Sequence, residues 1–178
     1  MGAVVEGVAL VAAAPDMARW VPAYVGLGSN LGDSVALIGR AIELLGESPL
    51  TRVVVRSGLY RTAPFGPVPQ QPFVNAVVGV ITQATPMQVL QRLLEIERVL
   101  GRRRDGERWG PRLIDLDLLV HGESRLQNEE LTLPHPGIPE RDFVLYPLLD
   151  VAPHLPIPGV GVVRDLAAQV TNRGVQRL

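Results

Sequence analysis

Two residue types with distinctive chemistry are missing from the 178-residue chain, which contains no cysteine and no lysine. The first absence excludes disulfide bonds, thiolate metal sites and a cysteine nucleophile. The second excludes a Schiff-base lysine, a lysine general base and the phosphate-binding lysine of a Walker loop. All 17 basic residues are arginine. Any phosphate bound by this chain must therefore be held by arginine, histidine, backbone N–H groups or a metal ion.

The chain also has little excess of charge of either sign, few aromatic residues and no long apolar run. The net charge is −1 and aromatic residues make up 4% of the chain, so no global electrostatic field attracts nucleic acid or a membrane surface. The first twenty residues are mildly apolar, but Glu6 interrupts them and no basic region leads them. These features argue against a secretory signal and a membrane span. We expect a cytoplasmic protein with no nucleic-acid partner and no membrane partner.

The length and an apolar fraction of 47% predict one globular domain with a substantial core. We interpret residues 1–20 as a loosely ordered extension and residues 21–178 as this single domain. Hydrophobic periodicity and turn signals predict the elements within it. In chain order they are a strand at 23–30, a helix within 29–46, strands at 52–62 and 73–82, a helix at 85–100, a strand at 112–122, and helices at 143–151 and 163–170.

The order β-α-β-β-α-β predicts an α+β fold of the ferredoxin-like (split βαβ) type, with helices packed on one face of an antiparallel sheet and C-terminal additions. The helix at 85–100 has the clearest signals, because Thr85 can cap it and Pro86 suits its first position. Two irregular segments, the proline-rich 61–72 and the charged 101–111, are each roughly a dozen residues long. Loops of this length in a compact domain are usually functional or disordered.

Asp115 and Asp117 stand within a run of leucine, isoleucine and valine. On a strand, residues two apart point to the same face, so the two carboxylates project together. Burying them is costly unless a cation or hydrogen bonds compensate the charge. Mg²⁺ would compensate it and complete its octahedron with water and phosphate oxygens. An acid pair at a sheet edge, bound to nearby arginines, would show the same pattern.

Arginine is concentrated just upstream of these acids, at Arg102, Arg103, Arg104, Arg108 and Arg112. Planar guanidinium groups bind phosphate oxygens in a forked geometry. A solvated charge run with a few salt bridges is the alternative, and we adopt it for Arg103. Trp109 lies in the same polar segment, and we interpret it as a lid over a flat ligand.

Phe73 and Asn75 share one face of their strand, because they are two residues apart. An aromatic ring for stacking beside a carboxamide suits the polar edge of a pterin or purine. A core phenylalanine and a strand-end asparagine would also fit the pattern. The proline-rich segment before them can present backbone N–H and C=O groups in fixed directions, or it can simply be a stiff loop.

The three histidines differ in context. His135 lies between two prolines, where little regular structure forms, and it can donate a hydrogen bond to phosphate or serve as an ordinary loop histidine. His121 and His154 have no supporting context, and we place both on the surface.

Four motifs occur in order along residues 24–150: YVGLGSNLGD, LYRTAPFGP followed by FVNAV, ERWGPRLIDLDLLVHG, and LTLPHPGIPERDFVLYPL. Together they resemble the 6-hydroxymethyl-7,8-dihydropterin pyrophosphokinase family of folate biosynthesis. The third is the most specific, because W-G-P-R followed by D-L-D is a long signature. The resemblance implies a monomeric enzyme that transfers the β,γ-pyrophosphoryl group of ATP to the pterin hydroxymethyl oxygen and releases AMP.

The resemblance also implies residue roles. Asp115 and Asp117 would hold two Mg²⁺ ions, and the catalytic residues would be Arg102, Arg112 and Asp117. ATP would contact Glu97, Arg104, Arg108, Trp109, Arg112, Thr132, His135 and Arg141. The pterin would contact Thr62, Ala63, Phe65, Phe73, Asn75 and Phe143.

On the residues alone, two other function classes stay open. Another Mg²⁺-dependent transferase, moving a single phosphoryl or a nucleotidyl group, would use the same acids and arginines without needing the aromatic–amide pair. A non-catalytic ferredoxin-like module that binds RNA would require exposed aromatics and a basic sheet face. The low aromatic content and the net charge of −1 disfavour that module.

Overall fold

The computed structural model describes residues 19–64, 67–102 and 110–178. The longer elements are β1 (Val21–Ser29), α1 (Ser34–Gly46), β2 (Thr51–Arg56), β3 (Tyr60–Thr62), β4 (Phe73–Thr82), α2 (Pro86–Val99), β5 (Asp115–His121), α3 (Asp142–Val151) and α4 (Val163–Gln169). The short elements are β6 (Leu126–Gln127), β7 (Thr132–Leu133), the 3₁₀ turn η1 (Ile138–Glu140), β8 (Pro156–Ile157), β9 (Gly161–Val162) and β10 (Gln176–Arg177). Within these ranges, no helix is long and apolar enough to cross a membrane.

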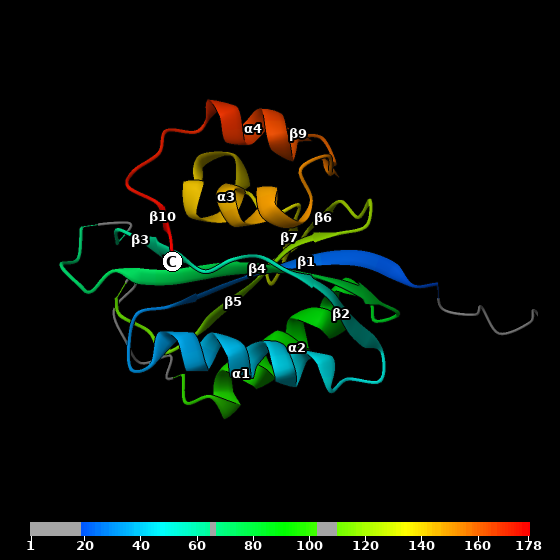
Figure 1. Cartoon of the computed structure of the whole chain (residues 1–178). Coiled ribbons are helices and arrows are strands. Elements are labelled where there is room, and N and C mark those ends of the chain that lie inside the picture. The colour runs from blue at the N-terminus through cyan, green and yellow to red at the C-terminus, as the bar shows by residue number, and fades with distance from the viewer. Residues whose placement is uncertain (1–18, 65–66, 103–109) are drawn as a thin grey trace, which may run out of the picture.

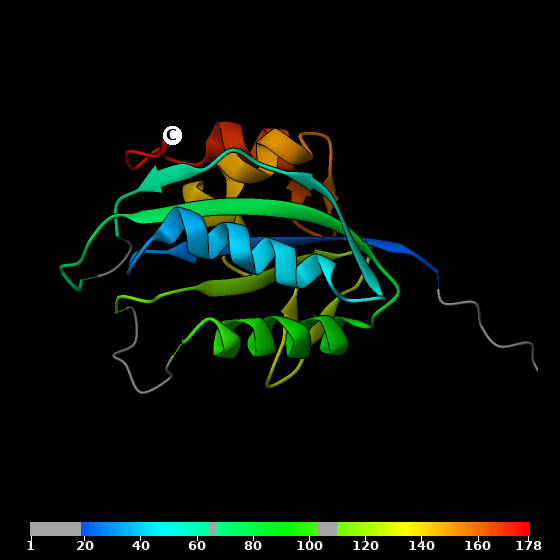
Figure 2. The ribbon, with the colours of Figure 1, turned by 60° about the horizontal axis from the view of Figure 1, so that its bottom comes forward.

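The main sheet has the strand order β10-β3-β4-β1-β5, and β2 also pairs with β4. Every pairing in it is antiparallel. With α1 and α2 as the two crossover helices, this order is the split βαβ arrangement, so the predicted α+β, ferredoxin-like class is confirmed. Figure 1 shows α1 and α2 on one face of the sheet and α3 and α4 on the other. The C-terminal additions therefore cover the face that the prediction left open, and Figure 2 shows the same two layers from another side.

The predicted strand at 52–62 is in fact two strands, β2 and β3, with a break between them. The side chain of Ser57 causes part of this break, because its Oγ accepts a hydrogen bond from the Val77 N–H at 2.9 Å. The Gly58 N–H donates instead to Asp150 Oδ2 on α3, at 3.0 Å. The first contact takes the Val77 N–H out of the strand ladder, and the second ties the chain to α3 before β3 begins.

Helix starts follow the sequence signals closely. Thr85 and Gln88 form a capping box at the start of α2, and Pro86 occupies its first turn, as predicted. At α1, the Asp33 side chain accepts from the Ala36 N–H. Val35 departs from the prediction, since it is 51% exposed although its spacing places it with the apolar side. It lies in the first turn, ahead of the buried positions of the helix.

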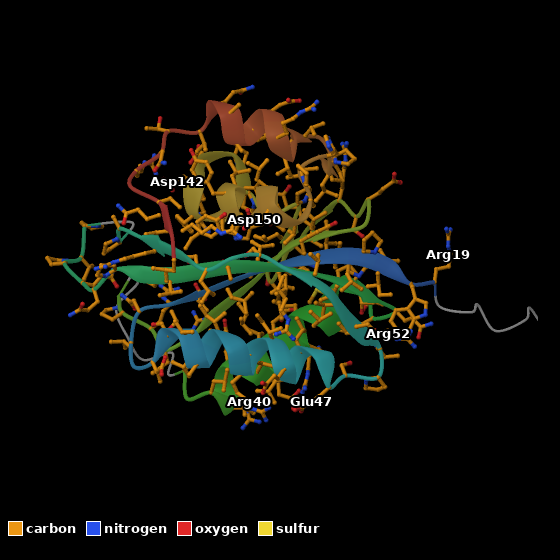
Figure 3. All side chains as sticks on the ribbon, in the orientation of Figure 1. Arg19, Arg40, Glu47, Arg52, Asp142 and Asp150 are labelled. Carbon is orange, nitrogen blue, oxygen red and sulfur yellow. The ribbon has the colours of Figure 1, made fainter. Side chains whose placement is uncertain are left out.

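The sheet separates two apolar layers, and side chains fill the space on both of its faces (Figure 3). Alternation along the strands assigns each residue to one layer. Leu27, Leu116 and Leu118 join the layer under α1 and α2, whereas Val77 and Leu119 join the layer under α3 and α4. The alternate positions on β1 and β5 therefore face α3, and they include Gly26 and Gly28 on β1 and both aspartates on β5.

One surface assignment is wrong. His121 ends β5 with only 6% of its surface exposed, and its Nε2 lies 2.9 Å from the main-chain oxygen of Ala84. The partner is distant in sequence, so local context did not reveal it. His154 is exposed, as expected.

Candidate active site

A pocket of about 320 Å³ opens on the α3 face of the sheet, lined by β1, β3, β4, β5 and the start of α3. Its size lies at the small end of the range for ligand sites. The central strand β1 contributes Gly26 and Gly28, which leave the floor open because they have no side chains. In the strand register, Gly28 lies between Asn75 on β4 and Asp115 on β5. The sheet thus places an amide and an acid on opposite sides of an open strip.

Asn75 is held in one orientation. It is 7% exposed, and its Nδ2 donates to Thr62 Oγ1 at 2.6 Å. The amide lies tightly across Gly28, because a Cβ built on that glycine would come within 2.8 Å of Asn75 Oδ1. A close contact of this kind requires glycine. The alternating glycines of the segment GLGS were the signal that sequence analysis left unused.

Two aromatic rings border the same pocket, Phe73 at the start of β4 and Phe143 in the first turn of α3. Both are half-buried. The guanidinium carbon of Arg141 lies 5.7 Å from the centroid of the Phe143 ring, within the range of a cation–π contact. The pocket therefore combines aromatic surface and a fixed amide at one end with charged groups at the other.

At the charged end, two arginines bind Asp115. Arg102 Nη1 lies 2.6 Å from Asp115 Oδ1, and Arg112 Nη1 lies 2.7 Å from Oδ2. The alternative interpretation of the acid pair, an acid bound to nearby arginines, is thus correct for Asp115. It does not hold equally for Asp117, whose ion pair within the described residues is with Arg141, at 4.0 Å from Nη1 to Oδ2.

Asp117 carries a charge that its surroundings compensate poorly. Burial against the pocket wall, together with the negative charge of Asp115, raises the pKa of Asp117 to about 6. Its side chain is still 42% exposed, so it can reach a ligand. Among the described residues, no group of three or more acidic or histidine side chains gathers to hold a metal ion. Two carboxylates completed by water and phosphate oxygens fit Mg²⁺, which does not require an all-protein cage.

Glu97 stabilises the arrangement from beneath. It is 2% exposed, pairs with Arg102, and accepts a hydrogen bond from the Leu116 N–H at 2.7 Å. Burial raises the pKa of Glu97, while the Leu116 N–H and Arg102 oppose the rise. Since Leu116 separates the two aspartates, Glu97 fixes both Arg102 and the strand that carries the acids.

His135 is a neutral hydrogen-bond donor in this pocket. Burial and the nearby Arg141 lower the pKa of His135 to about 4, so the ring is uncharged at neutral pH. Its Nδ1 accepts from the Gly137 N–H at 3.0 Å, which places the ring proton on Nε2. The Nε2–H group is then available as a donor to an anionic ligand.

The pocket brings together most of the residues singled out in the sequence: Thr62, Ala63, Phe73, Asn75, Arg102, Arg112, Asp115, Asp117, His135, Arg141 and Phe143. Glu97 and the half-buried Thr132 on β7 are described but do not line it. Five more lie outside the described residues: Phe65, Arg103, Arg104, Arg108 and Trp109. Residues 1–18 of the expected N-terminal extension lie outside them as well.

An acid pair beside several arginines suits a class of protein, the transferases that move phosphate groups by positioning and charge stabilisation. The family model for 7,8-dihydro-6-hydroxymethylpterin-pyrophosphokinase (HPPK) matches residues 24–153. The chain belongs to this family. It transfers a pyrophosphoryl group from ATP to 6-hydroxymethyl-7,8-dihydropterin, a step of folate biosynthesis.

Three curated relatives match over nearly their whole length, and each is named 2-amino-4-hydroxy-6-hydroxymethyldihydropteridine pyrophosphokinase. The protein from Methylorubrum extorquens is 46% identical, over 88% of this chain and 98% of the relative. The one from Pseudomonas aeruginosa is 43% identical, over 87% and 95%. The one from Haemophilus influenzae is 36% identical, over 89% and 98%.

Solved structures share the fold. A crystal structure of Plasmodium falciparum HPPK-DHPS superposes with a TM-score of 0.68 at 16% identity, over 87% of this chain and 46% of the other. The present chain therefore spans about half of that longer protein. At this identity the likeness supports the architecture alone.

Proposed function

We propose that the pocket on the α3 face is where ATP and the pterin meet, and that Asp115 and Asp117 hold two Mg²⁺ ions there. The observation that carries the proposal is that one pocket is lined at once by the acid pair, three arginines and the aromatic–amide set. An ordinary phosphoryl or nucleotidyl transferase needs only the first two. The enzyme needs all three, because it must align a flat heterocycle with a polyphosphate.

The charged end suits the phosphates. The pterin hydroxymethyl oxygen attacks the β-phosphorus of ATP, the bond from that phosphorus to the oxygen bridging the α-phosphate breaks, and AMP leaves with that oxygen. Arg102 and Arg112 stabilise the negative charge that develops, and His135 and Arg141 hold phosphate oxygens. Bound Mg²⁺ would neutralise phosphate charge and align the triphosphate. Asp117 orients the attacking hydroxyl group, and the proton of that group is released to solvent as the new bond forms.

The opposite end suits the pterin. Its ring system stacks between Phe73 and Phe143, while Asn75, Thr62 and the backbone of Ala63 read its polar edge. Phe65 completes this set in the proposal. Glu97, Arg104, Arg108, Trp109 and Thr132 remain proposed contacts on the ATP side. We also propose that residues 21–178 form a single domain, that the protein is monomeric and cytoplasmic, and that it has no nucleic-acid or membrane partner.

Replacing Phe143 tests the pterin end. Phe143→Ala removes one face of the stack, which is worth roughly 1–3 kcal/mol per base in comparable sites, so pterin affinity should fall by about 10- to 100-fold. The affinity for ATP with Mg²⁺ should stay nearly unchanged, and Phe143→Tyr should retain pterin binding. Isothermal titration calorimetry with each ligand separates the two effects. Equal losses of both affinities would place the ring in a purely structural role.

Gly28→Ala tests the close contact under the amide. The added methyl group would lie 2.8 Å from Asn75 Oδ1, so the amide must move and its bond to Thr62 must weaken. We expect pterin affinity to fall by about tenfold, which corresponds to one lost hydrogen bond. Gly39→Ala is the matched control, because nothing lies within 4 Å of the added atom, and alanine favours a helix. Unchanged pterin affinity in Gly28→Ala would contradict the assignment of Asn75.

A further inference from the structure

Asn30, the residue directly after β1, has a buried amide whose hydrogen bonds reach two segments far away in the sequence. It is 6% exposed. Its Nδ2 donates to Gln70 Oε1 at 2.9 Å and to the Gln71 main-chain oxygen at 3.0 Å. Its Oδ1 accepts from the Arg112 N–H at 2.9 Å. The Asn30 N–H also donates to the Arg112 oxygen at 3.1 Å, which closes a paired contact.

The two segments belong to opposite ends of the pocket. Arg112 lines the charged end and binds Asp115. Gln70 and Gln71 lead into β4, which starts with Phe73 at the aromatic end. Asn30 itself does not line the pocket, so it touches neither substrate directly. Its amide is nevertheless placed to transmit a displacement of one segment to the other.

Both halves of the amide are needed for these contacts, because one supplies N–H donors and the other an acceptor. Aspartate at this position would keep the oxygen that accepts from Arg112. It would lose both donors and would turn a negative oxygen toward the carbonyl of Gln71. The substitution therefore keeps the hydrogen bond from the Arg112 N–H and removes those to Gln70 and Gln71, with almost no change in the shape of the side chain.

We infer that Asn30 is a positioning residue that ties the Arg112 segment to the Gln70–Gln71 segment, so that filling the phosphate end of the pocket favours filling the pterin end. The inference rests on the proposed function, because it assigns each substrate to the end argued above. Each ligand stabilises the segment that it touches, and the shared amide passes part of that ordering to the other segment. Coupling of this kind is reciprocal and measurable as a ratio of two affinities.

The test compares pterin binding with and without a nucleotide. The probes are 6-hydroxymethylpterin and α,β-methylene-ATP with Mg²⁺, an analogue whose α–β bridge cannot be cleaved in the reaction. Calorimetry on the wild type should show tighter pterin binding when the analogue is present. The coupling ratio is the pterin affinity with the analogue divided by the pterin affinity without it. In Asn30→Asp we expect this ratio to fall by about tenfold toward one, while affinity for the analogue alone stays within about twofold of the wild-type value.

Asn172→Asp is the matched control. It adds the same charge on an exposed turn, and its side-chain oxygen keeps the bonds from the Gly174 and Val175 N–H groups. Its ratio of pterin affinities with and without the analogue should equal that of the wild type. Gln70→Met provides a second test if Asn30→Asp fails to fold, because it removes one acceptor and leaves Asn30 in place. We expect it to lower the ratio by a smaller factor.

Coupling that is absent from the wild type, or unchanged in both Asn30→Asp and Gln70→Met, would overturn the inference. So would a fall in affinity for the analogue alone as large as the fall in coupling, since that is the result of general misfolding. AMP formation by the wild type is recorded in parallel. Its absence would count against the proposed function, whatever the binding ratios show.

Discussion

An Asp117→Asn variant is expected to melt at a higher temperature than the wild type near neutral pH and yet to form product at least about 100- to 1000-fold more slowly. Both effects come from the same carboxylate. In the absence of ligands, burial and Asp115 disfavour its charge and raise the pKa of Asp117 to about 6. A neutral amide of the same shape removes this destabilisation. It also removes a ligand for Mg²⁺ and the group that orients the attacking hydroxyl.

The sign of the pH dependence follows from the raised pKa. The carboxyl group binds its proton more tightly in the folded state, where its pKa is about 6, than in the unfolded chain, where its pKa has the ordinary value of 3.8. Above about 6 the ionised group destabilises the fold fully, and below 3.8 both states are protonated and the penalty disappears. The melting-temperature gap between Asp117→Asn and the wild type should therefore narrow as the pH falls through this window.

Thermal melts without metal across this window, together with a turnover assay at neutral pH, check both expectations. Asp165→Asn serves as the control, because Asp165 lies on α4 with its side chain 59% exposed and should change neither quantity appreciably. A variant that turns over as fast as the wild type would contradict the metal assignment. A melting gap that is the same at every pH would contradict the account of the charge.

Arg102→Ala is the second substitution with a large expected effect, because it should lower both stability and rate. Arg102 pairs with the buried Glu97 and with Asp115. Removing it leaves the carboxylate of the buried Glu97 side chain without its ion-pair partner, and breaking a buried pair in this way costs about 3–5 kcal/mol. The lost charge stabilisation at the phosphates should slow turnover by about 100- to 1000-fold.

A double variant separates these two losses. Glu97→Gln in the Arg102→Ala background removes the unpaired charge, while its side-chain oxygen can still accept from the Leu116 N–H. We expect chemical denaturation to show most of the lost stability restored, and a turnover assay to show the rate still low. Recovery of the rate together with the stability would mean that Arg102 acts through the fold and not on the phosphates.

Local patterns in the sequence predicted the parts of the molecule that depend on near neighbours. Two-residue spacing correctly placed Asp115 beside Asp117 and Phe73 beside Asn75 on shared faces, because the strand period is insensitive to what lies beyond the strand. The capping signals of Thr85 and Pro86 were equally reliable. The order of strands and helices was enough to predict the ferredoxin-like class.

Contacts between distant segments account for what was missed. The break between β2 and β3 depends on Asp150 of α3, and the burial of His121 depends on the main-chain oxygen of Ala84. Neither partner is visible from the local pattern. The acid pair offered two interpretations, and both hold in part, because Asp115 is paired with arginines while Asp117 is poorly compensated. No local pattern distinguishes two aspartates with such similar neighbours.

The most direct test of the account is the identity of the nucleotide product. The protein is incubated with ATP, Mg²⁺ and 6-hydroxymethyl-7,8-dihydropterin, and AMP is separated from ADP by chromatography. We predict AMP and the pterin diphosphate in equal amounts, with no AMP when either the pterin or the metal is left out. Formation of ADP, or of AMP without the pterin, would contradict pyrophosphoryl transfer at this pocket.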